Sequence, residues 1–331
     1  MPHPDAFDPN DDALPRFFDV NRELNPVFAK RLYNKTYPKT FFHYTTPDAL
    51  IAILEGEEMW LSEATYLNDR NEIRHGEAIA IARLQSAIDA QTEDEPRTML
   101  LAVADLFQSK KPPAVYVACF SWDGDSLGQW RGYAHGGVAI EVEHSPLMFG
   151  YTSEGTYSEV RYDRPEEQWI FDELITAYAR AFAEDVRDPR LVKRRGPPLT
   201  VEEERAICAS KLYHDLWRHV VVFKSDAFQS EREVRFVYTA HDFSNNEKWY
   251  PVHQKPRFRV KDGRIIPYLT SRMLNFANMD TVREAPPLPI RSVVIGPRED
   301  QAVLERGIRS LLDVTGHGEA IIRLSHLSLR F

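Results

Sequence analysis

Cysteine is scarce in this sequence, which has only two, Cys119 and Cys208, among 331 residues. A disulfide framework needs several pairs of cysteines, and a cysteine-rich zinc site needs several such ligands close together. Both kinds of scaffold are therefore excluded. So few thiols suit a reducing cytoplasm, where we expect the protein to be located.

Long apolar runs are also missing. No run reaches the roughly 18 residues that a membrane-spanning helix needs. The acidic opening, MPHPDAFDPNDDALP, has neither the basic start nor the apolar middle of a signal peptide. We therefore expect no membrane partner, and we expect residues 1 to about 15 to be poorly ordered.

An excess of positive charge is lacking as well, because the formal net charge is −9. Broad, non-specific binding to nucleic acid is not expected, although a local basic groove stays open. The sequence also lacks the G-x-S-x-G, P-loop, H-E-x-x-H and EF-hand patterns. Serine hydrolase, P-loop NTPase and zincin functions therefore have no support.

The sequence does contain enough apolar material for a large core, with 43% hydrophobic and 11% aromatic residues. Strands are predicted at 39–45, 59–64, 114–121, 138–143, 155–162, 220–224, 231–239, 290–297 and 319–331, with a hairpin at 257–270. Helices are predicted at 47–56, 71–90, 95–110, 298–313 and across most of 165–217. This mixed order favours an α+β fold. We expect an N-terminal segment, 1–37, that is partly disordered and then helical, and one domain, 38–331, with a helical insertion at about 165–217.

His43 and Tyr44 close a predicted strand directly before a helix start, which Thr46 caps and Gly56 ends. They are either core residues or part of a binding site. In the second case His43 can hydrogen-bond a ribose hydroxyl, and the helix N-terminus offers N–H groups to an anion.

The stretch CFSWDGDSLGQWRGYAHGGVAIEV surrounds Arg131 with aromatic rings and glycines. The rings of Trp122, Trp130 and Tyr133 suit a flat ligand, and Arg131 can fork onto phosphate oxygens. Alternatively, the loop is packed by its own aromatic residues and Arg131 pairs with an acid.

In VFKSDAFQSEREVRFVYT, Glu231, Glu233 and Arg235 alternate along a predicted strand and are expected to share one face. Either Glu233 and Arg235 form a pair on an exposed sheet face, or a carboxylate is held there for chemistry. Lys224 and Arg232 supply positive charge nearby.

The segment from Asn68 to His75 contains Asp69 and Glu72. Asn and Asp form turns and caps by themselves, and this is the simpler interpretation. A metal-dependent nuclease using Asp69, Glu72 and His75 is the other.

Four segments in order resemble a bacterial family known as domain of unknown function 2971, which includes abortive-infection proteins of the AbiGi type. They are FFHYTTPDALIAILEGEEMWLSEATYLNDRNE, VACFSWDGDSLGQWRGYAHGGVAIEV, FKSDAFQSEREVRF and VVIGPREDQAVLERGIRSLL with IIRLSHLSLR. The resemblance spans roughly residues 38 to 330, and 165–217 is its least typical part.

The His-Tyr-Thr opening is also similar to the start of ADP-ribosyltransferases, which split NAD at the nicotinamide–ribose bond. This similarity implies a split β-sheet core with peripheral helices. It implies that NAD is the substrate and that no metal is needed. For NAD binding it implies that His43, beside Tyr44 and Thr45, holds the ribose and that Trp130 or Tyr133 stacks on nicotinamide. It also implies that Arg131 binds the pyrophosphate and that Arg235 contributes further to NAD binding. Catalysis is implied for Glu233 or Glu231, with His43.

The sequence thus leads to an expected function with two alternatives. We expect an NAD-dependent ADP-ribosyltransferase or NAD glycohydrolase in defence against phage, with an unknown protein or nucleic-acid acceptor. One alternative is a non-catalytic nucleotide-binding or regulatory protein of a defence or toxin–antitoxin locus. The other is the metal-dependent nuclease.

Overall fold

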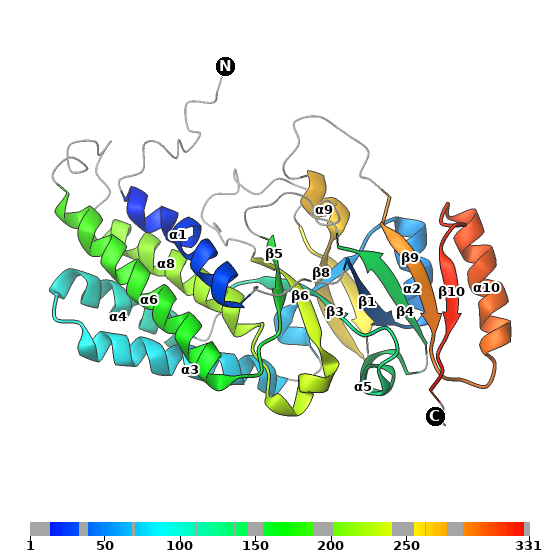
Figure 1. Cartoon of the computed structure of the whole chain (residues 1–331). Helices are drawn as coiled ribbons and strands as arrows, with labels where there is room; N and C mark the ends of the chain where they lie inside the picture. The colour runs from blue at the N-terminus through cyan, green and yellow to red at the C-terminus, as the bar shows by residue number, and fades with distance from the viewer. Residues whose placement is uncertain are drawn as a thin grey trace, which may run out of the picture. The chain divides into compact units, whose positions relative to one another are not determined.

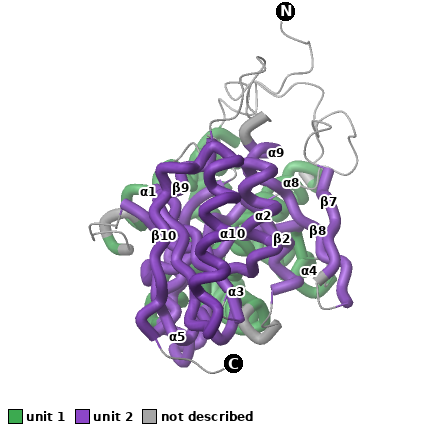
Figure 2. The backbone as a smooth tube through the Cα atoms, turned by 90° about the vertical axis from the view of Figure 1, so that its right-hand side faces the viewer, with its two compact units in different colours: residues 1–36, 71–113, 163–223 green, residues 37–70, 114–162, 224–331 purple. Residues whose placement is uncertain are grey.

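A computed structural model describes residues 14–32, 39–67, 70–109, 112–135, 137–144, 155–188, 201–239, 255–261, 263–276 and 287–327. They form two compact units, coloured in Figure 2. The first draws on residues 1–36, 71–113 and 163–223, and the second on 37–70, 114–162 and 224–331. Most of the opening segment predicted to be poorly ordered lies outside the described residues.

The first unit is helical (Figure 1). Its helices are α1 (Pro15–Leu32), α3 (Arg70–Ala90), α4 (Asp94–Gln108), α6 (Arg164–Arg187) and α8 (Val201–Val220). Helix α1 is fixed to α6 because Arg16 donates to Asp185 at 2.8 Å and to Asp188 at 3.0 Å. The helices predicted within 165–217 belong to this unit.

The prediction of a strand at 220–224 is wrong. Helix α8 continues to Val220, and a turn follows before Lys224. The apolar side chains from Val220 to Phe223 are all buried. A β-branched run fits the buried end of a helix when packing requires it, because intrinsic strand preference is weak against tertiary contacts.

The second unit contains a ten-stranded mixed sheet. Its strands are β1 (Thr40–Thr45), β2 (Trp60–Glu63), β3 (Val115–Ser121), β4 (Val138–Glu143), β5 (Gly155–Glu159), β6 (Glu233–Thr239), β7 (Arg257–Lys261), β8 (Arg264–Thr270), β9 (Ile290–Ile295) and β10 (Ile321–Leu324). The order is β10-β9-β4-β1-β3-β2-β8-β7, with β6 paired to β3 and β5 to β6. The predicted α+β class is confirmed.

The sheet divides at β3. One edge of β3 pairs with β6 along its whole length. The other edge pairs with β2 at Tyr116 and Val117, and with β1 only at Ser121. Strands β1 and β2 therefore lead away from β3 as separate arms. The expected likeness to the ADP-ribosyltransferase fold stays a prediction.

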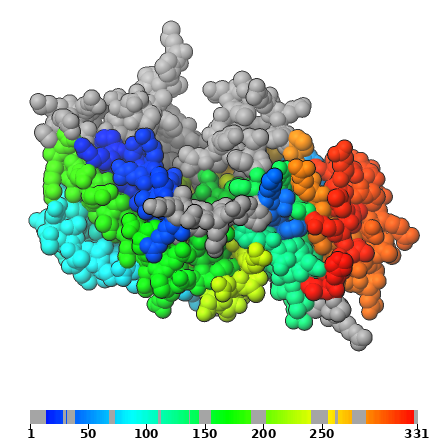
Figure 3. All heavy atoms as spheres, viewed as in Figure 1, coloured from blue at the N-terminus to red at the C-terminus, as the bar shows by residue number. Residues whose placement is uncertain are grey.

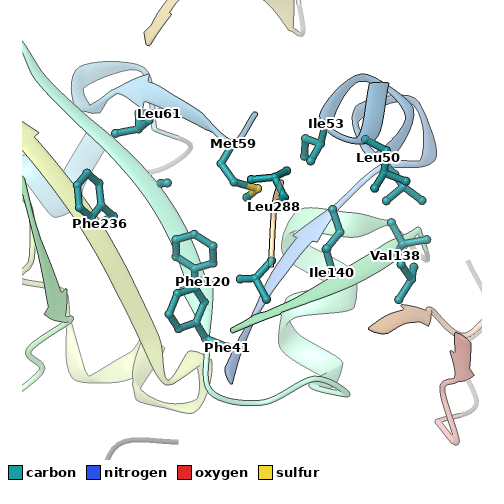
Figure 4. Close-up of a cluster of buried hydrophobic side chains, with 14 of the residues drawn as sticks. Phe41, Leu50, Ile53, Met59, Leu61, Phe120, Val138, Ile140, Phe236 and Leu288 are labelled. Atoms are coloured by element: carbon teal, nitrogen blue, oxygen red, sulfur yellow. The ribbon is translucent and has the colours of Figure 1, made fainter. Parts of the chain in front are cut away.

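The two faces of this sheet differ in chemistry. We call the side that carries Phe41, Phe120 and Phe236 the core face, because these rings belong to a large buried cluster (Figure 4). Helices α2 (Pro47–Gly56) and α10 (Gln301–Val314) add side chains to that cluster, and α10 also forms part of the outer surface of the unit (Figure 3). We call the opposite side the cluster face, after the cluster of charged side chains that it carries. Cys119 and Arg235 lie on this face and pair across β3 and β6.

Helix α2 begins as predicted, with the Thr46 hydroxyl accepting from the Ala49 N–H at 3.4 Å. It also ends at Gly56 as predicted, and Glu57, the next residue, takes the left-handed conformation with φ 50°. Among the helices that the structure describes, none has both the length and the apolar composition needed to cross a bilayer.

Candidate functional site

Four charged side chains lie together on the cluster face: Lys224, Glu231, Glu233 and Arg235. We call them the charged cluster. Lys224 Nζ donates to Glu231 Oε2 at 2.6 Å and to Glu233 Oε2 at 3.3 Å. Arg235 donates to both oxygens of Glu233, at 2.7 and 2.9 Å. All four residues are buried, and their opposite charges offset the cost of removing them from water.

Local backbone conformation brings the two glutamates together. Glu233 and Arg235 share one face of β6, as predicted. Glu231 was expected on the same strand, but it ends the 3₁₀ helix η4 (Asp226–Glu231). Arg232 follows with φ 45°, and this left-handed residue separates the helix from the strand. The Glu231 carbonyl accepts from Ser121 Oγ at 2.7 Å, which fixes its position beside β3.

Tyr133 completes the charged cluster from a short π-helix, η2 (Trp130–Ala134). Its hydroxyl lies 3.3 Å from Glu231 Oε2 and accepts from Lys224 Nζ at 3.3 Å. Burial raises the pKa of Tyr133, and the nearby Glu233 charge raises it further. The phenol therefore stays neutral and can donate to Glu231.

Glu233 is ionised despite its burial. Burial alone would raise its pKa, but the charges of Arg235 and Lys224 outweigh that effect and lower the pKa to about 2. Cys119 lies beside it on β3, and a hydrogen bond from its thiol also favours the carboxylate. Burial raises the pKa of the Cys119 thiol, so this cysteine is a neutral donor and not a thiolate nucleophile.

Tyr44 and Trp130 shape the loop above the sheet and do not offer a free ring. Their rings pack edge to face at 4.6 Å, and Trp130 is completely buried. The Trp130 indole donates to Asp125 Oδ1 at 2.8 Å, and the Tyr44 hydroxyl donates to the Asp123 carbonyl at 2.8 Å. The interpretation of a loop packed by its own aromatic residues therefore holds for Trp130, which has no exposed surface for stacking on nicotinamide.

His43 and Thr45 lie on the core face, so the structure does not bring them to the charged cluster. His43 pairs with Ile140 across the sheet, and its ring contacts Phe120 at 5.8 Å. Its Nδ1 donates to the Cys119 carbonyl at 2.9 Å, at the place where β1 and β3 part. Thr45 pairs with Val138 at the end of β1.

Arg131 takes no part in these contacts. It is exposed on the π-helix and has no hydrogen bond or ion pair with the residues that the structure describes. Its expected role in binding pyrophosphate stays a prediction.

The suggested metal site cannot be assembled from the described residues. Asn68, Asp69 and the side chain of Glu72 lie outside them. His75 belongs to the helical unit, where its Nε2 lies 3.0 Å from Glu167 Oε2. Within the described ranges, no group of three suitable side chains could hold a metal ion.

Cys119 was not anticipated from the sequence, whereas Lys224 supplies the positive charge that was expected near the glutamates. Alternation within AVYVACFS gives a usable signal for Cys119, because it places Cys119 and Ser121 on the same strand face. The contact of Lys224 with both glutamates was not predicted, since its exact position depends on the turn after α8.

Comparison with known proteins gives one match. A family model with the description "Protein of unknown function (DUF2971)" matches residues 129–236, a segment that contains the charged cluster and Tyr133. No curated protein and no solved structure gives a significant match to the chain. The match supports the resemblance to that family noted from the sequence, over the segment that forms most of the site.

Proposed function

We propose that the charged cluster and Tyr133 form the catalytic site of an enzyme that cleaves NAD between nicotinamide and ribose. The single observation that carries this proposal is a pair of buried carboxylates held by two cations under a tyrosine hydroxyl. Such a site can stabilise positive charge without a metal. An ADP-ribosyltransferase and an NAD glycohydrolase would both use it.

The bond cleavage needs a fixed negative charge. When nicotinamide leaves with the bonding electron pair, positive charge builds on the ribose C1′ and its ring oxygen. A preorganised carboxylate near C1′ stabilises that charge as it forms. Water, or an acceptor nucleophile, then bonds to C1′ and loses a proton.

Within the charged cluster, Glu231 is the better candidate for touching the substrate. Its side chain is 11% exposed, compared with 5% for Glu233. Both oxygens of Glu233 already accept hydrogen bonds from Arg235. We therefore assign catalysis to Glu231, and we assign to Glu233 the positioning of Lys224 and Arg235. NAD binding by Tyr133 belongs to the same proposal.

Release of free nicotinamide from NAD by the purified chain tests this proposal. Glu231→Gln removes the charge and keeps the shape, and we expect it to slow release by about 10²- to 10³-fold. Glu141→Gln is the matched control, because Glu141 also lies on the sheet, is 14% exposed and accepts from Thr40 at 2.8 Å. It should keep wild-type turnover. Absence of nicotinamide release by the wild type, or equal losses in both variants, would contradict the proposal.

A non-catalytic nucleotide-binding protein is the second candidate. It is favoured by the mutual pairing of all four charges, which is also how a purely structural ion network looks. Binding of NAD without nicotinamide release would identify this alternative. A role in defence against phage rests on the family resemblance alone and stays a prediction.

A further inference from the structure

The β7–β8 hairpin concentrates positive charge in an otherwise acidic chain. The stretch KPRFRVKDGR, residues 255–264, has five lysines or arginines and one acid, whereas the whole chain carries −9. The turn is as predicted, with Gly263 at φ 71° after Asp262 in the sequence. Strand β7 stands at the end of the sheet, so one of its edges pairs with no other strand among the described residues.

The pairing register gathers arginine and aromatic side chains on the same side of this hairpin. Arg257 pairs with Tyr268, and Arg259 pairs with Ile266. Across the next strand, Tyr268 pairs with Ser62. Directly paired residues of antiparallel strands project to the same face. These side chains therefore share a face with Trp60, two residues before Ser62.

The contacts show that this surface is built around the Arg259 guanidinium. It lies 5.1 Å from the centre of the Trp60 ring and 5.9 Å from that of Tyr268. Arg259 Nη2 donates to Ser62 Oγ at 2.7 Å, which holds the guanidinium in place. The rings of Trp60 and Tyr268 themselves pack at 5.2 Å.

Exposed cations flank this centre. The Arg257 side chain is 54% exposed and pairs with Glu58 at 2.8 Å. Arg264 is exposed and has no hydrogen bond or ion pair with any residue in the described ranges. We call Trp60, Arg257, Arg259, Arg264 and Tyr268 the arginine–aromatic surface.

We propose that the arginine–aromatic surface binds a single-stranded polynucleotide. Arginine forks match phosphate oxygens, and aromatic rings and guanidinium planes stack on unpaired bases. A groove for single strands combines these two features. An acidic peptide would use the charges but not the rings, so the combination favours a polynucleotide.

The surface lies on the cluster face. Ser62 pairs with Val117 of β3, and Val117 shares its strand face with Cys119. A bound strand would thus occupy the sheet face that carries the charged cluster. Its use as the acceptor of ADP-ribose rests on the proposed function, whereas the binding itself does not.

Fluorescence anisotropy with the full chain and a labelled DNA oligonucleotide of about 12 nucleotides, within the size range of single-strand sites, tests the proposal. We expect Arg257→Glu with Arg264→Glu to weaken binding at least about tenfold. The slope of log affinity against log salt should fall by about 1.4, because each lost phosphate contact contributes roughly 0.7.

The matched control combines Arg291→Glu with Arg306→Glu. Arg291 is a strand arginine that is 60% exposed and paired with Glu143, and Arg306 is exposed on α10. This variant changes the net charge equally and should keep wild-type affinity. Equal weakening in both variants would overturn the proposed location.

Two further results would overturn the choice of partner. One is absence of oligonucleotide binding by the wild type at low salt. The other is equally tight binding of a glutamate-rich peptide of the same charge, which would indicate an acidic protein partner. Because NAD is left out of the assay, loss of NAD turnover and loss of oligonucleotide binding are distinguished.

Discussion

The Glu233 carboxylate accepts from Arg235 through both oxygens and from Lys224 through one. Loss of its charge would leave Arg235 buried with a neutral partner. We therefore predict that Glu233→Gln lowers the free energy of unfolding at pH 7 by roughly 3 kcal/mol, the usual cost of breaking a buried pair. Denaturant titration measures it. Asp300→Asn is the control, because Asp300 pairs with Arg298 at the surface and should have little effect.

We also predict that the effect of Glu233→Gln on stability depends on pH. The folded pKa of Glu233, about 2, lies below the ordinary glutamate value of 4.5. The stabilisation is therefore fully present above about pH 4.5 and is lost as the pH falls toward 2. The difference in stability between wild type and Glu233→Gln should shrink over that range. A difference that stays constant down to pH 2 would show that the charge of Glu233 does not stabilise the fold.

Which side chains lie together was predictable where it depends on alternation within one strand. Glu233 and Arg235 share a face because they are two residues apart in β6. Glu231 joins them for another reason, the left-handed Arg232, which residue spacing does not reveal. His43 was expected to complete the site. It lies on the other face. Alternation along β1 predicts which side chains share a face, but it does not predict which of the two faces carries the core.

At the scale of elements, the chain between the π-helix η2 and β4 is closely packed at Gly137. A Cβ atom added at Gly137 would lie 2.6 Å from the Thr45 carbonyl oxygen and 2.8 Å from that of Ala134. Since both are backbone atoms, the chain itself must shift. We predict that Gly137→Ala lowers stability by roughly 1–3 kcal/mol, as overpacking does.

Gly132 provides the contrast, because it lies inside the π-helix η2 (Trp130–Ala134) itself. A Cβ atom added there meets nothing within 4 Å. Because Ala favours helical conformation over Gly, Gly132→Ala should be neutral or stabilising by up to about 1 kcal/mol. Thermal unfolding of the two variants side by side checks both expectations. A larger loss in Gly132→Ala than in Gly137→Ala would contradict this description of the packing around the two glycines.

Most elements were predictable because their patterns are strong. The Thr46–Pro47 start of α2, the apolar strand β3 and the hairpin around Gly263 all follow from local residue preferences. The run 220–224 was not, because it has strand composition but begins at the last residue of a helix and continues as a turn.

At the scale of the whole molecule, β3 and β6 each have partner strands on both edges. Strand β3 pairs with β6 on one edge and with β1 and β2 on the other, while β6 also pairs with β5. Backbone amides with partners on both sides open only when large parts of the unit unfold. We predict that Val115–Ser121 and Glu233–Thr239 exchange hydrogen more slowly than β7 and β10 in mass-spectrometric measurements. Faster exchange in β6 than in β7 would contradict the observed strand order.

The division into two units was not predicted. Each unit is built from separated segments, and the helical unit joins the N-terminal helix to residues 71–113 and 163–223. Composition changes little along the chain, so no boundary stands out. The grouping arises from long-range contacts such as that between Arg16 and Asp185, which sequence periodicity does not encode.

Nicotinamide release by His43→Gln beside Glu231→Gln is the most direct test of the claim that the chemistry belongs to the cluster face. Gln at position 43 can still donate to the Cys119 carbonyl, so the local fold should persist. We predict that His43→Gln retains turnover of NAD while Glu231→Gln loses about 10²- to 10³-fold. Loss of turnover in His43→Gln with retention in Glu231→Gln would contradict the claim and place the site on the core side of β1.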